Sequence, residues 1–382
     1  MTTPTPPNVS PHWQGRRILI AAGGTGGHIF PALAVAQALR EFGADLHWVG
    51  SNRGLEARVV RDAQKINLTE LRFQGVRGRG FSALLSLPIR LLGAMVECRR
   101  LVRDFRPSLV LVFGGYVSFP VGIAAWLQRV ALVVHEQNAV MGTANRWLSR
   151  FATRVLTSFS PTYRSPASAV CVGNPVRPEL IAQGRALGRT LGEAQPLRLL
   201  VIGGSLGARA LNQALPEAVA ASQSSWPQGI AVQHQTGLSE HAEVQARYQA
   251  LGLSEEQVQV HAFIDNMAQA YAWADLVIAR AGASTVSELA ALGLPAIFVP
   301  LPNAIDDHQT ANARAMVMAK AALLVKQSPE LASALGQRLS QLDFSGLQAM
   351  TEKAQGLAKG PTSLENYLQQ LALLDSSAKE AS

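Results

Sequence analysis

Residues 17–28 read RILIAAGGTGGH, a short apolar run that ends in a cluster of glycines and leads into a helical pattern. Residues 197–208 read LRLLVIGGSLGA and repeat the same arrangement about 180 residues later. A strand, a glycine-rich turn and a helix in this order open a doubly wound α/β domain. The sequence therefore predicts two such domains in tandem.

Continuous apolar runs predict further strands of parallel sheets that are covered on both faces. These runs are Leu46–Val49, Leu109–Phe113, Leu132–His135, Leu276–Ala279 and Ala296–Val299. The predicted fold class is α/β, with two Rossmann-like doubly wound parallel-sheet domains whose boundary lies between residues 174 and 196. We place the N-terminal domain at 16–177, the C-terminal domain at 178–355, a last helical segment at 356–374 and flexible tails at 1–15 and 375–382.

Composition limits the class of protein. Hydrophobic residues make up 48% of the chain and charged residues 16%, which is enough apolar content for sizeable cores and excludes a wholly disordered chain. Cys98 and Cys171 cannot form a disulfide framework and fit a reducing compartment as buried thiols. No apolar signal-peptide region precedes Arg16. Residues 107–128 carry no charge, but the glycines and Pro120 within them favour strand, turn and helix over a membrane span.

Charge is distributed unevenly along the chain. The first 180 residues carry 21 Lys and Arg against 9 Asp and Glu, whereas the remainder carries 13 against 17. The basic half is expected to face an anionic partner, such as a membrane surface, a phosphorylated ligand or nucleic acid. Arginines between Arg77 and Arg103 surround the apolar stretch Phe81–Leu92, a pattern that fits docking on an anionic leaflet. An amphipathic core helix with a solvated arginine face is the alternative, and no nucleic-acid-binding motif accompanies the charge.

The first glycine loop lies where open parallel sheets bind ligands, beyond the carboxyl end of a strand. The helix start after it offers N–H groups to a phosphate or a sugar oxygen, although its glycines could also serve only close helix packing. NAD is a weaker candidate, because the second strand ends in Gly50-Ser51 without the expected acid. A helix N-terminus keeps an imidazole neutral and able to accept a proton, so His28 is a candidate base. A histidine that only caps or packs is the alternative.

Polar residues also follow later strands. His135-Glu136-Gln137-Asn138 directly after an apolar run fits a cleft lining that binds sugar hydroxyls, with a solvated loop as the alternative. Arg177 lies at the presumed hinge between the domains, where forked donors could hold a diphosphate, but a surface arginine is the ordinary case.

The richest cluster is residues 280–288, RAGASTVSE, after the run Leu276–Ala279. Ser284 or Thr285 is expected to start a helix with an anion site, and Glu288 could accept hydrogen bonds from both hydroxyls of a ribose. A capping box between Thr285 and Glu288 is an equally good interpretation of the spacing. Asp306–Gln309 could close the same pocket.

Metal ligands and hydrolase motifs are not evident in the sequence. There is no clustered Cys/His set and no HExxH, so we expect no metal. A Gly-x-Ser-x-Gly elbow at a strand end is also missing.

Six motifs appear in the order found in one family of enzymes. They are GGTGGH at 23–28, GGYVSFP at 114–120, HEQN at 135–138, GNPVR at 173–177, GGSLGAR at 203–209 and RAGASTVSE at 280–288. Together they resemble the MurG family, from about residue 16 to about residue 374. These enzymes are UDP-N-acetylglucosamine transferases that act on undecaprenyl-pyrophosphoryl-MurNAc-pentapeptide.

The resemblance implies a GT-B fold, with a cleft between the domains and a C-terminal helix that crosses back to the N-terminal domain. It implies inverting transfer of GlcNAc from UDP-GlcNAc to the C4 hydroxyl of MurNAc in lipid I, which gives lipid II and UDP during peptidoglycan synthesis. No cofactor or metal is implied. The implied location is peripheral, on the anionic cytoplasmic face of the bacterial inner membrane, with no nucleic acid and with other cell-wall synthesis proteins as partners that the sequence does not name.

His28 is the first candidate for the base that takes the hydroxyl proton, because of its position at a helix start and its expected neutral state, and Glu136 is the second. The resemblance assigns the substrate contacts. Asn138 is expected on the sugar, Arg177 on the diphosphate, and Ile264 on uracil through its backbone. The remaining substrate-binding residues implied are Thr25, Gly26, Gly27, Ser205, Ala283, Ser284, Thr285, Val286, Ser287, Glu288 and Gln309, the last in a register uncertain by one residue.

Two other classes compete with this interpretation. A UDP-GlcNAc 2-epimerase shares the broad fold and the donor, but needs no lipid acceptor and no basic apolar surface. A membrane or nucleic-acid adaptor would explain the charge, but not polar residues at so many strand ends.

Overall fold

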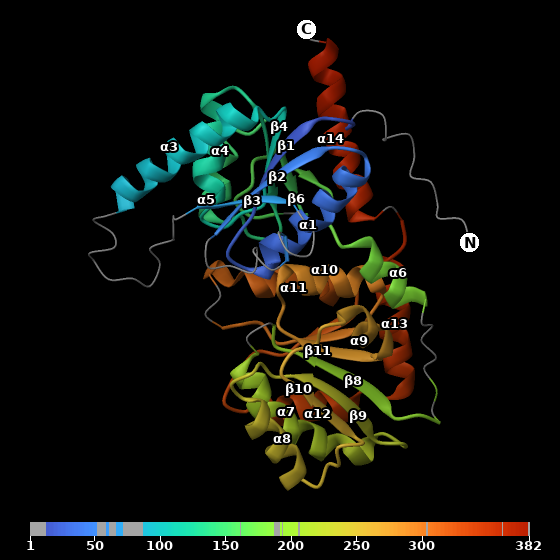
Figure 1. Cartoon of the computed structure of the whole chain (residues 1–382). Helices are drawn as coiled ribbons and strands as arrows, with labels where there is room; N and C mark the ends of the chain where they lie inside the picture. Colours follow the sequence, from blue (N-terminus) through green and yellow to red (C-terminus); the bar gives the residue numbers. More distant parts are fainter. Residues whose placement is uncertain are drawn as a thin grey trace. The chain divides into compact units, whose positions relative to one another are not determined.

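The computed structural model describes residues 13–51, 59–60, 66–71, 87–160, 162–186, 192, 194–204, 207–302, 305–360 and 362–380. The chain divides into two compact units (Figure 1). The first unit consists of residues 1–177 and 361–382, and the second of residues 178–360. The chain therefore leaves the first unit after Arg177 and returns to it after Gly360.

The first unit contains a seven-stranded sheet in which every pairing is parallel. The strand order is β3-β2-β1-β4-β5-β6-β7, so the chain winds outward from β1 in both directions. The strands are β1 Arg17–Ala21, β2 Asp45–Ser51, β3 Asn67–Leu71, β4 Leu109–Val112, β5 Ala131–Glu136, β6 Arg154–Thr157 and β7 Val170–Cys171.

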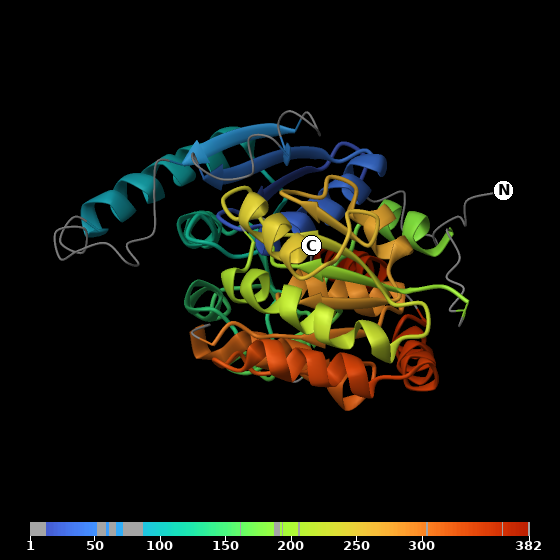
Figure 2. The same ribbon diagram turned by 90° about the horizontal axis from the view of Figure 1, so that it is seen from below.

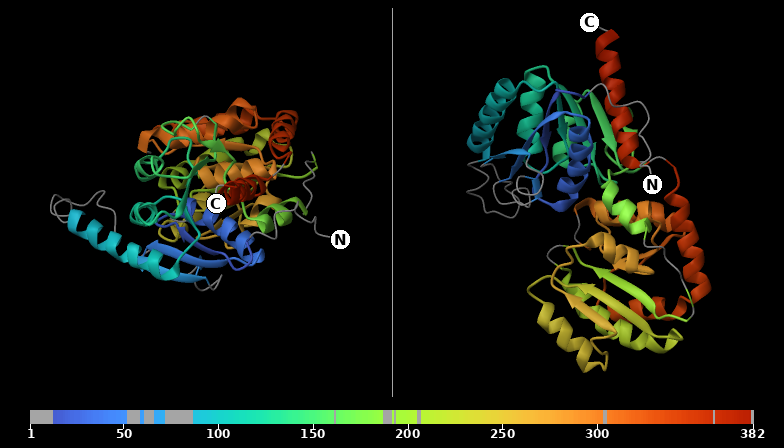
Figure 3. Two further views of the ribbon diagram at one scale, coloured as in Figure 1. Left: turned by 90° about the horizontal axis from the view of Figure 1, so that it is seen from above. Right: turned by 45° about the vertical axis from the view of Figure 1, so that its right-hand side comes forward.

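Helices cover both faces of this sheet (Figure 3). Alternate residues of β1 point to opposite faces: Ile18 and Ile20 join one core, and Leu19 and Ala21 join the other. This division explains why the strand is apolar from Ile18 to Ala21. The helices are α1 Gly26–Glu41, α3 Leu87–Phe105, α4 Ser118–Leu127, α5 Thr143–Leu148 and α14 Ser363–Glu380.

The two ends of the chain differ from the sequence prediction. Trp13 is fully buried in the core beneath α1, and the Gly15 N–H donates to the Gly43 carbonyl, so the predicted flexible tail is wrong for residues 13–15. At the other end, α14 continues to Glu380 instead of ending near residue 374. Its buried Tyr367 and Leu371 pack into the same core as Trp13. Burial of apolar side chains fixes both segments.

The second unit contains a six-stranded sheet, again with only parallel pairs, in the order β10-β9-β8-β11-β12-β13. Its strands are β8 Leu197–Ile202, β9 Ile230–Gln235, β10 Val258–His261, β11 Leu276–Ala279, β12 Ala296–Phe298 and β13 Ala322–Leu324. Its helices are α6 Pro178–Ala186, α7 Arg209–Ser222, α8 His241–Ala250, α9 Met267–Trp273, α10 Ala283–Leu292, α11 His308–Met318, α12 Leu331–Gln341 and α13 Phe344–Leu357, with short 3-10 turns at Gln223–Ser225 and Ile305–Asp307.

Each unit thus starts with a strand that occupies the interior of a parallel sheet and runs into a glycine turn and a helix. The predicted fold class of two parallel α/β units is confirmed. Residues 107–128 form β4, a turn and α4 as predicted, and none of the described helices is long and apolar enough to cross a membrane. Cys98 is buried, and burial raises the pKa of its thiol to about 12, but Cys171 is exposed, contrary to the prediction.

Candidate active site

His28 lies in the first turn of α1, just past the carboxyl end of β1. Its Nδ1 is 3.2 Å from the carbonyl oxygen of Gly23 and 3.1 Å from the hydroxyl of Thr25. A carbonyl oxygen only accepts hydrogen bonds, so the contact with Gly23 places the proton of a neutral ring on Nδ1. Nε2 then carries the lone pair, which is the form that can accept a proton.

The loop after β4 packs its backbone against this turn. A Cβ added to Gly114 would come within 3.1 Å of His28 Nε2, and one added to Gly115 would come within 2.3 Å of the Gly23 carbonyl oxygen. Both glycines have positive φ, at 100° and 80°. The buried Ser118 hydroxyl accepts the Gly114 N–H at 3.0 Å. The GGYVSFP motif therefore forms the wall beside His28.

The polar HEQN motif is mostly inside the first unit. His135 and Glu136 are the last two residues of β5, and both are buried together with Gln137; only Asn138 is partly exposed. The prediction that all four residues line a cleft is therefore wrong, as is the solvated-loop alternative. Burial lowers the pKa of His135 to about 4, although its hydrogen bond with Asn174 acts in the opposite direction.

Glu136 organises the loop that carries Asn138. One carboxylate oxygen accepts the backbone N–H of Asn138 at 2.9 Å and its side-chain amide at 3.2 Å. The other accepts the Gly142 N–H at 3.0 Å and the Asn145 side chain at 2.9 Å. Burial raises the pKa of Glu136, and these four hydrogen bonds oppose that rise. The buried carboxylate is thus fully engaged in holding Asn138 and α5.

Arg177 is the last residue of the first unit before the chain enters the second. Its guanidinium lies 5.1 Å from the ring centroid of Phe30, which belongs to α1 and follows His28 by two residues. The structure therefore brings Arg177 to the same helix start as Thr25, Gly26, Gly27 and His28.

The second unit has a cavity of about 530 Å³ at the carboxyl end of its sheet. The turn after β8 forms one side, and a Cβ on Gly203 or Gly207 of that turn would strike backbone atoms. The start of α10 forms another side, with Gly282 and Thr285. Arg280, Leu301, Gln309 and Gln327 complete much of the lining. A cavity of this size suits a small-molecule ligand.

Helix α10 decides between the two interpretations of Glu288. The helix begins at Ala283, with Gly282 as its N-cap and no side-chain capping bond. Thr285 and Glu288 therefore both lie inside the helix, and the capping-box alternative is wrong, as is a helix start at Ser284 or Thr285. Instead, the buried Tyr271 hydroxyl donates to Glu288 Oε2 at 2.7 Å. This bond orients the Glu288 carboxylate.

The other residues predicted on this helix differ in what they can offer. Ala283 and Val286 are buried in the core. The Val286 N–H donates to the Gly282 carbonyl as part of the helix. The Ser284 hydroxyl is buried and has no hydrogen-bond partner among the described residues. Ser287 is partly exposed. A ligand at this helix start would meet the N–H groups of the first turn, the Ser284 hydroxyl and Thr285.

One predicted contact, Ile264, lies on a loop near this cavity, a second, Gln309, lies in the first turn of α11, and a third is outside the described residues. The Ile264 N–H donates to Gln235 Oε1 at 3.2 Å. The Gln309 side chain accepts the Leu301 N–H at 2.9 Å, which holds the loop after β12 against the start of α11. Ser205, in the second glycine turn, lies outside the described part of the chain.

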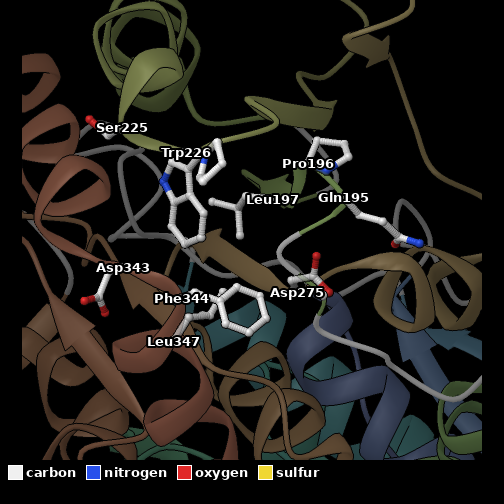
Figure 4. Close-up of a pocket in the computed structure, with 11 residues that line it drawn as sticks. Gln195, Pro196, Leu197, Ser225, Trp226, Asp275, Asp343, Phe344 and Leu347 are labelled. Carbon is white, nitrogen blue, oxygen red and sulfur yellow. The ribbon is translucent and has the colours of Figure 1, made fainter.

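A second cavity, of about 270 Å³, lies at the opposite, amino end of the same sheet (Figure 4). Trp226, Leu197 and Phe344 give it an apolar lining, and two carboxylates border it. Both carboxylates have structural partners. Asp275 forms a two-point ion pair with Arg198, and Asp343 caps α13 by accepting the Gly346 N–H. Among the described residues that line this cavity, both carboxylates are therefore held by structural contacts. Across the described ranges, no three His, Cys, Asp or Glu side chains gather as they would around a metal.

Sequence reasoning missed three residues that shape the sites: Asn145, Tyr271 and Gln235. Gln235 directly follows the apolar-rich run 230–234 and could have been found by the same reasoning that selected HEQN. Asn145 and Tyr271 lie within helices and meet their glutamate partners only through the fold.

Family models match both units. The glycosyltransferase family 28 N-terminal domain matches residues 18–157, and the C-terminal domain of the same family matches residues 198–367. The chain belongs to glycosyltransferase family 28. This family membership favours a transferase over the epimerase and adaptor alternatives.

Relatives within the family agree over nearly the whole chain. A Bordetella pertussis protein is 50% identical over 338 residues, which is 88% of this chain and 92% of that protein. A Marinobacter nauticus protein is 46% identical over 347 residues, 90% of this chain and 94% of that one. Both are named UDP-N-acetylglucosamine--N-acetylmuramyl-(pentapeptide) pyrophosphoryl-undecaprenol N-acetylglucosamine transferase. The crystal structure of Acinetobacter baumannii MurG matches with a TM-score of 0.73 and 34% identity, over 94% of this chain and 98% of that one.

Proposed function

We propose that this family 28 enzyme transfers GlcNAc from UDP-GlcNAc to the C4 hydroxyl of MurNAc in lipid I, with inversion at the anomeric carbon. The products are lipid II and UDP. The observation that carries the proposal is the division of chemistry between two strand-end sites. The first unit presents a histidine set up to accept a proton, and the second presents a cavity between a glycine turn and a helix N-terminus.

The second unit is assigned the donor. The glycine turn after β8 and the first turn of α10 offer backbone N–H groups to the diphosphate. Glu288, oriented by Tyr271, accepts hydrogen bonds from the ribose hydroxyls. The backbone of Ile264 meets uracil, and Gln309 contacts the nucleotide or the sugar. Fixed N–H dipoles stabilise the negative charge that grows on UDP as it leaves.

The first unit is assigned proton transfer from the acceptor. The C4 hydroxyl oxygen attacks C1 of GlcNAc on the face opposite UDP, and the hydroxyl proton passes to His28 Nε2. The Gly23 carbonyl holds Nδ1–H and so keeps Nε2 as the accepting nitrogen. Arg177 is assigned to the diphosphate and Asn138 to the sugar.

Glu136 is assigned a positioning role. A raised pKa would suit a base, but both of its oxygens already accept hydrogen bonds from Asn138, Gly142 and Asn145. Taking up a proton would weaken these contacts, which hold the loop that carries Asn138. His28 is therefore the better candidate.

A lipid acceptor is reached only at a membrane surface. We assign the contact with that surface to α3 and the end of α4. Ile89 and Leu92 expose 79% and 63% of their surfaces, and Arg99, Arg100 and Arg103 lie on the same helix. The helix extends beyond the strands of its sheet (Figure 2). Gln128, just after α4, donates to the Arg99 carbonyl, so the end of α4 lies against this part of α3. Trp126, near that end, is 45% exposed. The predicted residues 77–86 lie outside the described part of the chain.

Binding to lipid vesicles would test this surface. The full chain should bind vesicles that contain about one third anionic lipid, and binding should weaken as salt rises, because surface charges are screened. Charge reversal of Arg99 and Arg103 together should lower binding, and equal binding by this variant would remove the assignment.

The activity itself is tested by UDP release from UDP-GlcNAc in EDTA, with and without a soluble lipid I analogue. We expect release only when the acceptor is present, and no dependence on divalent metal. Release or epimerisation without acceptor would contradict the proposal and support the epimerase alternative.

A further inference from the structure

Gln235 joins two loops of the proposed donor site. It is the last residue of β9, which lies between β8 and β10, and it is only 3% exposed. Its amide nitrogen donates to the Gly204 carbonyl at 2.8 Å, and its amide oxygen accepts the Ile264 N–H at 3.2 Å. One buried side chain thus connects the turn after β8 with the loop after β10.

The end of β9 also supports the glycine turn from below. A Cβ on Gly207 would come within 1.8 Å of the Thr236 carbonyl oxygen, so the turn sits directly on the residue after Gln235. Asn212 in α7 donates to that same carbonyl at 2.9 Å. The Gly204 carbonyl accepts the Gly207 N–H in addition to the Gln235 amide. These contacts hold Gly204 and Gly207 against the end of β9.

The geometry points to Gln235 as a positioning residue that sets the spacing between the diphosphate and uracil subsites. This inference rests on the proposed function, which places the diphosphate at the turn after β8 and uracil at Ile264. A nucleoside diphosphate must reach both loops at once, so a fixed spacing favours a ligand that spans them. A ligand that reaches only one loop does not depend on that spacing.

The chemistry of the side chain fits this role closely. The bridge needs a donor toward a carbonyl and an acceptor toward an N–H, and a primary amide supplies both. Methionine has a similar length and is apolar, so Gln235→Met keeps the packing and removes both hydrogen bonds. Gln235→Glu keeps the acceptor, but at neutral pH it places a carboxylate oxygen against the Gly204 carbonyl oxygen.

Competitive inhibition of the full-length enzyme by UDP and by uridine gives the test. For Gln235→Met we expect the UDP inhibition constant to rise about tenfold, the effect of losing one to two hydrogen bonds, with the uridine constant and kcat within about twofold. Gln233→Met, two residues earlier on β9 and partly buried, is the matched control and should change neither constant. Equal losses for UDP and uridine, or an unchanged UDP constant, would overturn the inference.

Gln235→Glu supplies a second readout that a packing defect would not produce. A protonated carboxyl group again offers a donor and an acceptor, so UDP binding relative to the wild type should recover as the pH falls from about 8 to about 6. A constant ratio would count against the bridge. Glu288→Ala distinguishes a failure of this inference from a failure of the proposed donor site. If Glu288→Ala raises the UDP-GlcNAc KM while Gln235→Met has no effect, only the inference about Gln235 fails. If neither variant changes donor binding, the proposed donor site fails.

Discussion

Both units end one strand with a buried histidine followed by a polar residue that organises loops. In the first unit the pair is His135-Glu136 at the end of β5, and in the second it is His234-Gln235 at the end of β9. Both histidines are fully buried, and burial lowers the pKa of His135 to about 4 and that of His234 to about 3. The two strands occupy different places in their sheets, so the likeness arises from local chemistry.

The difference between the two pairs lies in charge. Glu136 is a buried carboxylate that needs four donors, and it receives them from one continuous segment, residues 138–145. Gln235 is neutral and needs one donor and one acceptor, which it finds on two separate loops. A buried charge is stable only when many dipoles converge on it, whereas an amide can bridge two segments. The first pair therefore rigidifies one loop and the second couples two.

The largest expected effect concerns turnover, which is assigned to the first unit. His28→Ala should lower kcat by about 10³-fold, a typical loss for a general base, and leave the UDP inhibition constant within about twofold. His47→Ala is a control in the same unit, since His47 bonds Thr69 and lies on β2, away from the strand-end loops. Near-normal turnover of His28→Ala at saturating substrates would end the assignment of the base to the first unit.

A smaller effect is expected on donor affinity in the second unit. Glu288→Ala should raise the UDP-GlcNAc KM by about 30-fold with kcat changed little, because two charge-assisted hydrogen bonds to the ribose are lost. Tyr271→Phe removes only the hydroxyl that orients Glu288 and should raise KM about threefold. Steady-state kinetics over a range of donor concentrations measures both. A larger loss for Tyr271→Phe than for Glu288→Ala would contradict a direct role of the carboxylate.

The smallest effect is the acid sensitivity of the two buried histidines. Each has a folded-state pKa below the unfolded value of about 6.5, so the stability it contributes is present above pH 6.5 and is lost as the pH falls toward the folded pKa. Between pH 7 and pH 5.5 each unit should lose about 1 kcal/mol of unfolding free energy from its histidine. Urea denaturation at the two pH values measures this loss. A difference between the units should appear only below about pH 4, where His135 alone begins to take up its proton in the folded state.

Most of the fold could be predicted because it depends on local pattern. The run 197–202 and the run 276–279 match β8 and β11 residue for residue, since an apolar segment bounded by glycine or polar residues fits a buried parallel strand. The chain ends could not be predicted in the same way. Trp13 follows a proline-rich stretch, and only the surface offered by the core beneath α1 makes its burial favourable.

The site residues also differ in how far the sequence could predict them. The order of six motifs identified the family. The first glycine turn and His28 lie where the sequence predicts them, because a strand, turn and helix in succession fix their own geometry over a dozen residues. The burial of His135, Glu136 and Gln137, the bond from Tyr271 to Glu288 and the bridge at Gln235 each depend on groups that are distant in the chain. The sequence alone determined the fold class and the family, because periodicity and motif order are local properties. Only the tertiary structure decided which polar groups hold the loops, because a polar side chain takes its role from the partners that folding brings within hydrogen-bond distance.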